Sequence, residues 1–359
     1  MHIEENIPLA PFTTFGIGGP ARWFVEAASE AEIAEAAEWA RDRRVPLFVL
    51  GGGSNLLVTD AGFDGLVLRV ALRGIEAEDA SDGSGQKIYR AAAGEDWEHC
   101  VQRTLDDNCA GLECLAGIPG TVGGTPVQNV GAYGQEVSSV IDRVRAFDLK
   151  ERAFVEFAAA ECGFAYRRSR FNTVDRGRFV VTRVDYRLKP GGAPTIRYAE
   201  LERELVSGQA AGREASLAEV AAVVRRIRQL KGMLLVEGDP DCRSAGSFFK
   251  NPVVSEEEYR RIAAVSAASA GTAPPRFPAG SGAESQGRVK VPAAWLIEQA
   301  GFAKGYRRGN AGISSRHTLA LVNLGGASAA EIVALAGEIR GAVEARFGIR
   351  LEKEPVMVG

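Results

Sequence analysis

Apolar residues recur at helical spacing in three segments, and each segment opens with a helix start signal. Ser29 and Glu32 form a capping box, a pair whose side chains bond the first free backbone N–H groups, and the helix is expected to end near Arg43. The same signature predicts helices that begin after Ser216 and after Ser328. The last of them places its apolar face at Ile332, Leu335, Ile339, Val343 and Phe347.

Shorter apolar or alternating runs between the helices predict strands. Residues 46–50 form a continuous apolar run, typical of a buried strand, and residues 140–149 and 153–157 alternate like paired strands. Other strands are expected at 21–26, 66–70, 87–93, 179–189 and 319–323, and other helices at 96–108, 256–267 and 292–300. Because 359 residues exceed what one hydrophobic core holds, two or three domains are expected.

A first glycine loop follows the apolar run at 46–50. It consists of Gly51, Gly52, Gly53, Ser54, Asn55 and Leu56, and its backbone N–H groups can face a phosphate. A nucleotide-binding Rossmann unit would continue into a helix, whereas here the turn Asp64-Gly65 leads into another strand. Taken alone, the loop is consistent with either a phosphate site or a tight turn between strands.

A second glycine-rich stretch runs from Gly111 to Gly134 and holds seven glycines in 24 residues. Interleaved Ile, Val and Thr residues distinguish it from a flexible linker, which would be rich in Ser. The composition suits backbone packed flat against a large planar ligand. The alternative is a set of tight turns between buried strands.

Residues 246–252 combine a hydroxyl with two aromatic residues. The Gly246-Ser247 step places the hydroxyl where a ligand can approach, and Phe248 and Phe249 can exclude water from it. Ser247 is therefore a candidate proton donor. The alternative is a turn beside a buried Phe pair.

An arginine cluster lies earlier in the chain, between aromatic residues. Such a cluster is usually a solvated face, but flanking aromatics allow it to hold a carboxylate or phosphate through paired hydrogen bonds. The cluster consists of Arg167, Arg168 and Arg170, between Tyr166 and Phe171.

The composition of the chain argues against several classes of function. A net charge of −3, a pI of about 5.9 and dispersed Lys and Arg residues argue against a nucleic-acid or membrane surface. No run approaches the ~18 apolar residues of a membrane span, and the N-terminus lacks the basic start and apolar run of a signal peptide. Five cysteines without a CxxC pair predict free thiols in a reducing compartment, and three widely separated histidines predict no metal site.

Together these motifs resemble the UDP-N-acetylenolpyruvoylglucosamine reductase (MurB) family, flavoenzymes of peptidoglycan precursor synthesis. The resemblance runs almost end to end, from residues 14–19 to residues 351–354. The glycine loops occur in a wider class of FAD proteins. Their combination with three other motifs is specific to the family: Tyr166-Arg167-Arg168-Ser169, residues 246–252, and Ala294-Trp295-Leu296-Ile297-Glu298.

The resemblance implies an α+β fold. It has an FAD-binding domain of the vanillyl-alcohol-oxidase (PCMH) type in two lobes and a C-terminal α+β substrate-binding domain. The first lobe is expected at residues 1–72, with the C-terminal segment 348–359 as a candidate neighbour. The second lobe is expected at residues 73–212, and the substrate-binding domain at residues 213–359. We expect FAD to be held non-covalently, because the glycine loops contain no His and their one Cys, Cys114, precedes the core of its loop.

The resemblance also implies a reaction, that of UDP-N-acetylmuramate dehydrogenase. NADPH reduces FAD, flavin N5 gives a hydride to C3 of UDP-N-acetyl-3-O-(1-carboxyvinyl)-glucosamine, and Ser247 gives a proton to C2. The product is UDP-N-acetylmuramate. The implied partners are this UDP-sugar and NADPH, with no nucleic acid and no membrane, and family analogy implies a monomer in a bacterial cytoplasm.

The family's site residues carry over one by one. Ser247 matches the proton donor, and Arg167 with Glu354 matches the pair that polarises the substrate carboxylate and stabilises the developing enolate. The substrate-binding matches are Tyr166, Lys231, Asn251 and Tyr198. Lys231 and Asn251 resemble residues that contact the uridine diphosphate, and Tyr198 lies in a segment that resembles the substrate-covering loop of type I members. The expected FAD contacts are Gly51, Gly52, Gly53, Ser54, Asn55, Leu56, Gly117, Ile118, Pro119, Gly120, Thr121, Gly123, Gly124, Gly131, Ala132 and Tyr133.

Three features depart from the family's pattern. Arg243-Ser244 stands before Ala245-Gly246-Ser247, where an Asn is common. Pro355 follows the C-terminal glutamate, where Val is common, so Glu352 stays an alternative to the favoured Glu354. Residues 266–286, rich in Ala, Ser, Gly and Pro, predict a mobile surface insert that is long for the family.

Two other functions are alternatives. One is another FAD oxidoreductase of the same fold that oxidises an alcohol or hydroxy acid with O2. The other is a catalytically silent flavin- or nucleotide-binding protein, which the presence of both Ser247 and Arg167 disfavours.

Overall fold

The three helices that the start signals predict are all present in the computed structural model, which describes residues 1–208, 214–270, 273–279 and 287–359. They are α1 (Glu30–Asp42), α4 (Leu217–Leu230) and α7 (Ala329–Phe347). The hydroxyl of Ser29 accepts a hydrogen bond from the Glu32 N–H, and Ser328 and Glu331 form a complete capping box. The five apolar residues predicted for the face of α7 are buried.

The chain forms two units. The first comprises residues 1–7, 21–53 and 63–230, and the second comprises residues 8–20, 54–62 and 231–359. The domain boundaries expected from the sequence stay predictions, and the one at 212/213 lies outside the described residues.

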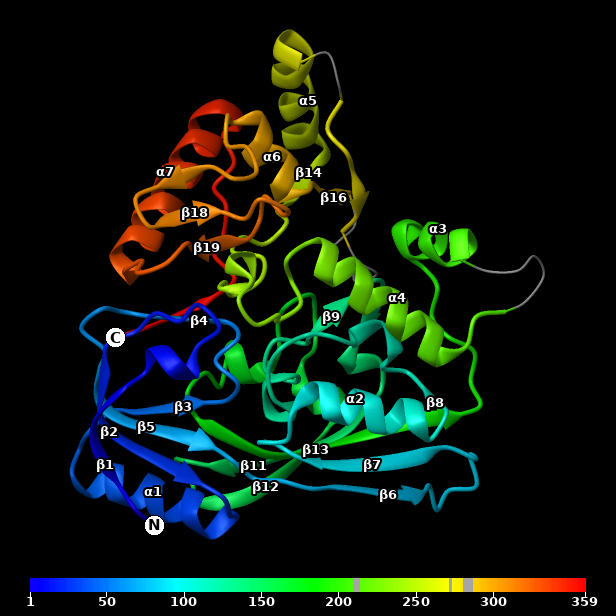
Figure 1. The fold of residues 1–359 in the computed structure, drawn as a ribbon. Coiled ribbons are helices and arrows are strands. Elements are labelled where there is room, and N and C mark those ends of the chain that lie inside the picture. Colours follow the sequence, from blue (N-terminus) through cyan, green and yellow to red (C-terminus); the bar gives the residue numbers. More distant parts are fainter. Residues whose placement is uncertain (209–213, 271–272, 280–286) are drawn as a thin grey trace. The chain divides into compact units, whose positions relative to one another are not determined.

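A four-stranded sheet forms one part of the first unit (Figure 1). Its order is β1-β2-β5-β3, and β2 and β3 both run parallel to β5. The strands are β1 (Glu4–Pro8), β2 (Pro20–Ala27), β3 (Leu47–Leu50) and β5 (Phe63–Val70). Helix α1 packs on this sheet, since Ile33, Ala36 and Ala40 share a buried core with Leu66 and Leu68.

A six-stranded sheet forms the other part of the first unit. Its path β12-β11-β13-β7-β6 is antiparallel, and β8 pairs with β13. The strands are β6 (Ile75–Asp79), β7 (Lys87–Ala92), β8 (Cys109–Ala110), β11 (Ile141–Asp148), β12 (Ala153–Ala158) and β13 (Phe179–Pro190). Helix α4 also belongs to this unit, together with helix α2 (Trp97–Asp106), helix α3 (Ala199–Gly208) and the hairpin of β9 (Gly131–Ala132) and β10 (Gln135–Glu136).

The second unit is built around α7. Two small sheets have the orders β17-β18-β19 and β14-β16-β15, and β4 pairs in parallel with β20. The strands are β4 (Leu56–Val58), β14 (Val253–Ser255), β15 (Phe277–Pro278), β16 (Arg288–Lys290), β17 (Arg307–Arg308), β18 (Ala311–Ile313), β19 (Leu321–Asn323) and β20 (Val356–Val358), and the other helices are α5 (Glu256–Ala270) and α6 (Ala293–Gln299). The Asp60 carboxylate accepts hydrogen bonds from the N–H groups of Ala329 and Ala330 (2.7 and 3.0 Å) and so caps α7.

The start of one predicted segment is wrong, and one helix was missed. The predicted surface insert at 266–286 begins inside α5, where Ser266 is fully buried, because the Ala-rich end of this segment favours the helix. Strand β15 also lies in it, and residues 271–272 and 280–286 fall outside the described chain. Helix α3 was not predicted from the sequence.

Two further expectations can be compared with the described chain. The five cysteines are free, as predicted, and all of them are buried. Among the described residues, none of the helices has the length and apolar character needed to cross a bilayer.

Candidate active site

The first two glycine stretches contact each other through their backbones. A Cβ atom on Gly52 would lie 2.5 Å from the Gly120 Cα atom, and one on Gly51 would lie 3.0 Å from the Thr121 Oγ1 atom. No side chain fits at this contact, because 2.5 Å is far inside the van der Waals distance between carbon atoms. The loop after β3 and the loop before residue 122 therefore form one backbone-lined surface.

The second stretch is also fixed to the sheet behind it. The N–H of Val122 donates to the Glu95 carbonyl (2.9 Å), and the N–H of Gly123 donates to the Ala93 carbonyl (2.8 Å). A Cβ atom on Gly123 would lie 2.7 Å from the Ala93 Cβ atom, so this glycine is required by packing within the protein. The alternative of tight turns thus explains some of these glycines, but it leaves one polar atom unexplained.

That atom is the Thr121 hydroxyl oxygen. It is buried and has no hydrogen-bond partner in the described part of the chain. A buried hydroxyl without a partner costs about 1–3 kcal/mol, so an unpaired one indicates a ligand group or water at this position. Backbone surface and an orphan hydroxyl fit a phosphate-bearing planar cofactor such as FAD.

The third stretch expected to contact FAD, Gly131 to Tyr133, begins the hairpin of β9 and β10. Tyr133 and Gly134 occupy its turn with φ angles of 49° and 83°, which are left-handed. The guanidinium of Arg167 donates from Nη2 to the Gly131 carbonyl (2.8 Å), and the rings of Tyr133 and Tyr198 meet edge to face at 5.5 Å. The structure therefore brings Arg167, Tyr198 and the Tyr133 hairpin together within the first unit.

Arg167 itself sits in a tight turn. Ala165 and Arg168 exchange two backbone hydrogen bonds of 3.0 Å, so Tyr166 and Arg167 are the central residues of the turn. Arg167 has a φ of 55°, a conformation that is uncommon for a non-glycine residue and often marks functional sites. Its guanidinium carbon lies 5.3 Å from the centre of the Tyr166 ring.

Ser247 follows a left-handed glycine in the second unit. Gly246 has a φ of 69°, and the hydroxyl of Ser247, which is half-buried, has no hydrogen-bond partner within the described residues. Phe248 and Phe249 are 0% and 1% exposed and belong to the core of this unit. The aromatic pair therefore fixes the loop from inside.

The C-terminal segment pairs with this serine loop. The N–H of Glu354 donates to the Phe248 carbonyl (2.9 Å), and the N–H of Lys250 donates to the Glu352 carbonyl (3.0 Å). Ser247 and Glu354, over one hundred residues apart in the sequence, thus lie on adjacent, antiparallel backbone segments.

The same segment then changes partner at Pro355. The N–H of Val356 donates to the Asn55 carbonyl (2.9 Å), and the Asn55 side chain donates to the Glu354 carbonyl (3.3 Å). Pro355 stands between the two pairings, where no N–H is needed, which explains this departure from the family's pattern. The end of the first glycine loop is therefore bonded directly to Glu354.

The two candidate glutamates differ in their surroundings. The Glu352 side chain is 77% exposed and lies 3.6 Å from the Lys250 ammonium, whereas Glu354 is half-buried. An exposed carboxylate interacts weakly with a substrate group, because water screens its charge. The geometry favours Glu354.

The two expected diphosphate contacts have different surroundings. The Asn251 side-chain oxygen accepts a hydrogen bond from the Ala293 N–H (2.9 Å), so this atom already caps α6. Lys231 is half-buried and directly follows α4. Asn251 therefore has a structural role besides any contact with a ligand.

Two residues beside these loops were missed by the sequence reasoning. Arg228 is only 8% exposed, and this burial lowers the pKa of its guanidinium. Its Nε donates a hydrogen bond to the Gly117 carbonyl (2.9 Å). Glu113 is fully buried, and its carboxylate accepts hydrogen bonds from the N–H groups of Gly111 and Thr195 (both 2.8 Å). Arg228 could have been found, because it lies one turn after Val224 on the apolar face of α4.

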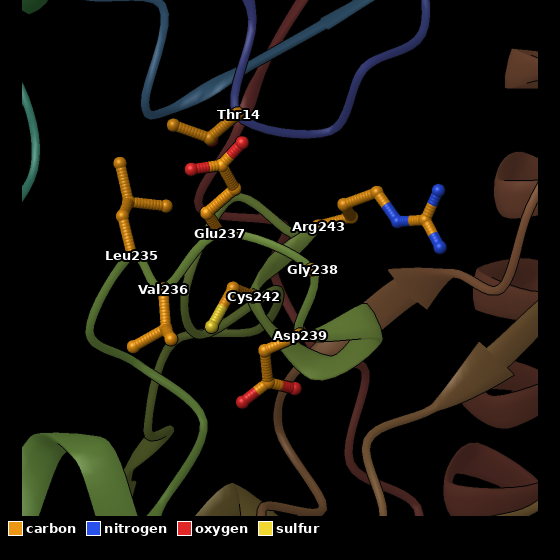
Figure 2. Close-up of a pocket in the computed structure, with 8 residues that line it drawn as sticks. All are labelled: Thr14, Leu235, Val236, Glu237, Gly238, Asp239, Cys242 and Arg243. Atoms are coloured by element: carbon orange, nitrogen blue, oxygen red, sulfur yellow. The ribbon is translucent and has the colours of Figure 1, made fainter.

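A cavity of about 420 Å³ lies in the segment that leads to the serine loop (Figure 2). Figure 2 shows Glu237 beside Thr14 at one end and Asp239 at the other. The lining residues are Thr14, Leu235, Val236, Glu237, Gly238, Asp239, Cys242 and Arg243. Apart from the departure noted at Arg243, sequence reasoning gave no role to this segment.

The backbone contact between the glycine loops predicts that Gly52→Ala loses FAD. The added methyl group must displace Gly120, so we expect the dissociation constant for FAD to rise at least about tenfold, equivalent to ~1.4 kcal/mol. Titration of the apoprotein with FAD measures it. Gly341→Ala in α7, where a Cβ atom meets nothing within 4 Å, is the control. Unchanged FAD affinity in Gly52→Ala would refute the proposal that this backbone-lined surface holds FAD.

Two family models match the chain. A model described as an FAD binding domain matches residues 21–151, and one described as the UDP-N-acetylenolpyruvoylglucosamine reductase C-terminal domain matches residues 239–358. Together with the glycine-loop surface, these matches define an FAD-binding protein with a separate C-terminal domain.

Related proteins that align with almost the whole chain identify its family. The UDP-N-acetylenolpyruvoylglucosamine reductase of Streptomyces coelicolor is 47% identical over 99% of this chain and 90% of its own length. That of Thermobifida fusca is 46% identical over 99% of this chain and 98% of its own length. The superposition with the crystal structure of the Thermus caldophilus reductase (MurB) covers 100% of both chains, with 28% sequence identity and a TM-score of 0.65. The chain belongs to the UDP-N-acetylenolpyruvoylglucosamine reductase family.

These comparisons confirm three predictions from the sequence. They are the family, the α+β fold class with its FAD-binding domain, and the assignment as an enzyme, UDP-N-acetylmuramate dehydrogenase.

Proposed function

We propose that this protein uses NADPH to reduce UDP-N-acetyl-3-O-(1-carboxyvinyl)-glucosamine to UDP-N-acetylmuramate. The observation that carries the proposal is the pairing of residues 248–250 with residues 352–354, which sets Ser247 and Glu354 on adjacent backbone segments. Both residues match the reactive groups of the family's motifs.

Bound FAD supplies the hydride chemistry that connects NADPH with the double bond of the sugar. The residues proposed to hold it are the backbone-lined loops at 51–56 and 117–124 and the hairpin at 131–133, with the Thr121 hydroxyl as a hydrogen-bonding group. Arg228, buried against the Gly117 carbonyl, stiffens the second loop and adds a positive charge beside it.

Ser247 gives the proton to C2 of the substrate. A serine hydroxyl is a weak acid at neutral pH, so it acts only when it is held in line with a strongly basic carbon. The left-handed Gly246 and the buried Phe248 fix the backbone on both sides of Ser247, while its hydroxyl has no partner among the described residues. This arrangement leaves the O–H free for the substrate.

Glu354 and Arg167 act on the substrate carboxylate. The guanidinium pairs with the carboxylate and stabilises the negative charge that develops as the double bond is reduced. Glu354 donates a hydrogen bond to the same group when it is protonated. Tyr166, Tyr198, Lys231 and Asn251 bind the rest of the sugar nucleotide, and the contact of Tyr198 with Tyr133 supports its place beside the cofactor hairpin.

Anaerobic titration of the reduced enzyme tests the proposal. One equivalent of the enolpyruvyl sugar should reoxidise one equivalent of flavin and yield UDP-N-acetylmuramate. A flavin that stays reduced with this sugar but is reoxidised by O2 would instead indicate an oxidase that acts on an alcohol or hydroxy acid. The preference for NADPH, the monomeric state and the cytoplasmic location stay predictions.

A further inference from the structure

An ion-pair cluster lies in the second unit outside the reactive groups. The Asp241 carboxylate accepts hydrogen bonds from the Ser315 N–H (2.8 Å), the Ser315 hydroxyl (2.7 Å) and the Arg316 Nε (3.0 Å). The Arg316 Nη2 also donates to Asp239. Arg316 thus bridges two carboxylates that precede the serine loop.

Asp241 is held as an anion in this cluster. Its residue is 8% exposed, and although burial alone raises its pKa, the hydrogen bonds from Ser315 and Arg316 lower the pKa below the usual value. A buried carboxylate with this many donors is a rigid junction, because removing its charge leaves those donors poorly paired.

The turn that carries Lys231 packs directly on the ion pair. Gly232 has a φ of 65°, and a Cβ atom there would lie 2.9 Å from the Asp241 Cβ atom and 3.2 Å from the Arg316 Nε atom. No other residue type fits without a shift of the ion pair or the turn. The position of the Lys231 backbone therefore depends on where Asp241 and Arg316 lie.

The serine loop is held by the same elements. The N–H of Phe248 donates to the Leu319 carbonyl (2.8 Å), three residues after Arg316, and the N–H of Asn323 donates to the Arg243 carbonyl (2.9 Å). Asp239, the second partner of Arg316, forms one end of the cavity in Figure 2. The segment 314–319 therefore contacts the chain both at Asp241 and directly after Ser247.

We propose that Arg316 and Asp241 are positioning residues for substrate reduction, which hold the Lys231 turn against the loop that carries Ser247. The proposal rests on the proposed function, in which Lys231 binds the diphosphate and Ser247 gives the proton. Through these contacts the ion pair sets the distance between Lys231, at the binding end of the site, and Ser247, at the reacting end. Displacements of about 1 Å at such a site can cost about 100-fold in rate.

Asp241→Asn and Arg316→Lys test this proposal. Asparagine removes the charge at constant size, and lysine keeps the charge but cannot bridge both carboxylates. We expect flavin reoxidation by the enolpyruvyl sugar to slow by about 10- to 100-fold. The dissociation constant for UDP-N-acetylmuramate, measured by calorimetry, should rise by about tenfold. The rate of flavin reduction by NADPH should stay within about twofold of wild type.

Arg308→Gln is the matched control, because it removes the Arg308–Glu338 ion pair (3.0 Å) in the same unit, where both side chains are well exposed. It should leave both half-reactions unchanged. If Asp241→Asn does not fold, Arg316→Lys decides. Wild-type behaviour of the folded variants, or an equal loss of reduction by NADPH, would overturn the proposal.

A double-mutant cycle with Ser247→Ala separates this proposal from the proposed function. If Asp241 acts by placing Ser247, then Asp241→Asn should slow reoxidation by less than about twofold in the Ser247→Ala background. A full multiplicative loss there would refute positioning. If Ser247→Ala alone is reoxidised at the wild-type rate, the proposed function fails. If Ser247→Ala is reoxidised slowly but Asp241→Asn is reoxidised at the wild-type rate, only the positioning role is refuted.

Discussion

Ser247→Ala is expected to slow the oxidation of the reduced flavin by the enolpyruvyl sugar about 1,000-fold. General acid catalysis contributes about 10²–10⁴ in rate, and the structure offers Ser247 a fixed backbone with its hydroxyl unpaired among the described residues. Reduction of the flavin by NADPH should stay within about twofold of wild type, because that step needs no proton from Ser247. Stopped-flow absorbance of the flavin measures both steps separately.

Ser255→Ala is the matched control for this prediction. The Ser255 hydroxyl accepts a hydrogen bond from the Glu258 N–H (3.1 Å) at the start of α5, so its loss should cost about 1 kcal/mol of stability. The rates of both half-reactions should not change. A loss below about tenfold in Ser247→Ala, only ~1.4 kcal/mol of barrier, would show that another group gives the proton.

Glu354→Gln is expected to slow the same reoxidation step by about 10²–10³-fold. Removing one group that stabilises developing charge in a transition state costs about this much. Flavin content should stay near that of wild type, because glutamine keeps the backbone bonds to Phe248 and Asn55. The measurement is single-turnover reoxidation at saturating substrate.

Glu352→Gln provides a control two residues away. Its side chain is exposed and faces Lys250, so we expect less than about a twofold effect, since exposed ion pairs contribute about 0–1 kcal/mol. If Glu352→Gln is the slower variant, the assignment of the two glutamates must be exchanged. Equal rates in both variants and wild type would exclude a catalytic glutamate in this segment.

Local patterns in the sequence predicted much of the fold. Capping boxes located the starts of α1, α4 and α7, because their side chains bond backbone groups only three residues away. Helix α3 and the extension of α5 to Ala270 were missed. Composition alone did not separate these Ala- and Glu-containing segments from loops, since packing decides whether such segments are helical.

The site was less accessible from the sequence than the fold. Glycine density located the two loops, but the contact of Gly52 with Gly120 joins residues far apart in the chain. The pairing of Phe248 with Glu354 and the ion pair of Arg316 with Asp241 likewise depend on tertiary structure. Motif resemblance supplied Ser247, Arg167 and Glu354 as candidates, and the physical reason to prefer Glu354 over Glu352 came from burial.

A crystal structure of the protein with FAD and UDP-N-acetylmuramate tests the proposed arrangement of the reactive groups. We predict that the Ser247 hydroxyl lies within hydrogen-bonding reach of the product's C2 position, with C3 facing flavin N5. Arg167 and Glu354 should both contact the product's lactyl carboxylate. A structure in which the Ser247 hydroxyl faces away from the product, or in which the flavin lies outside the glycine loops, would contradict the mechanism.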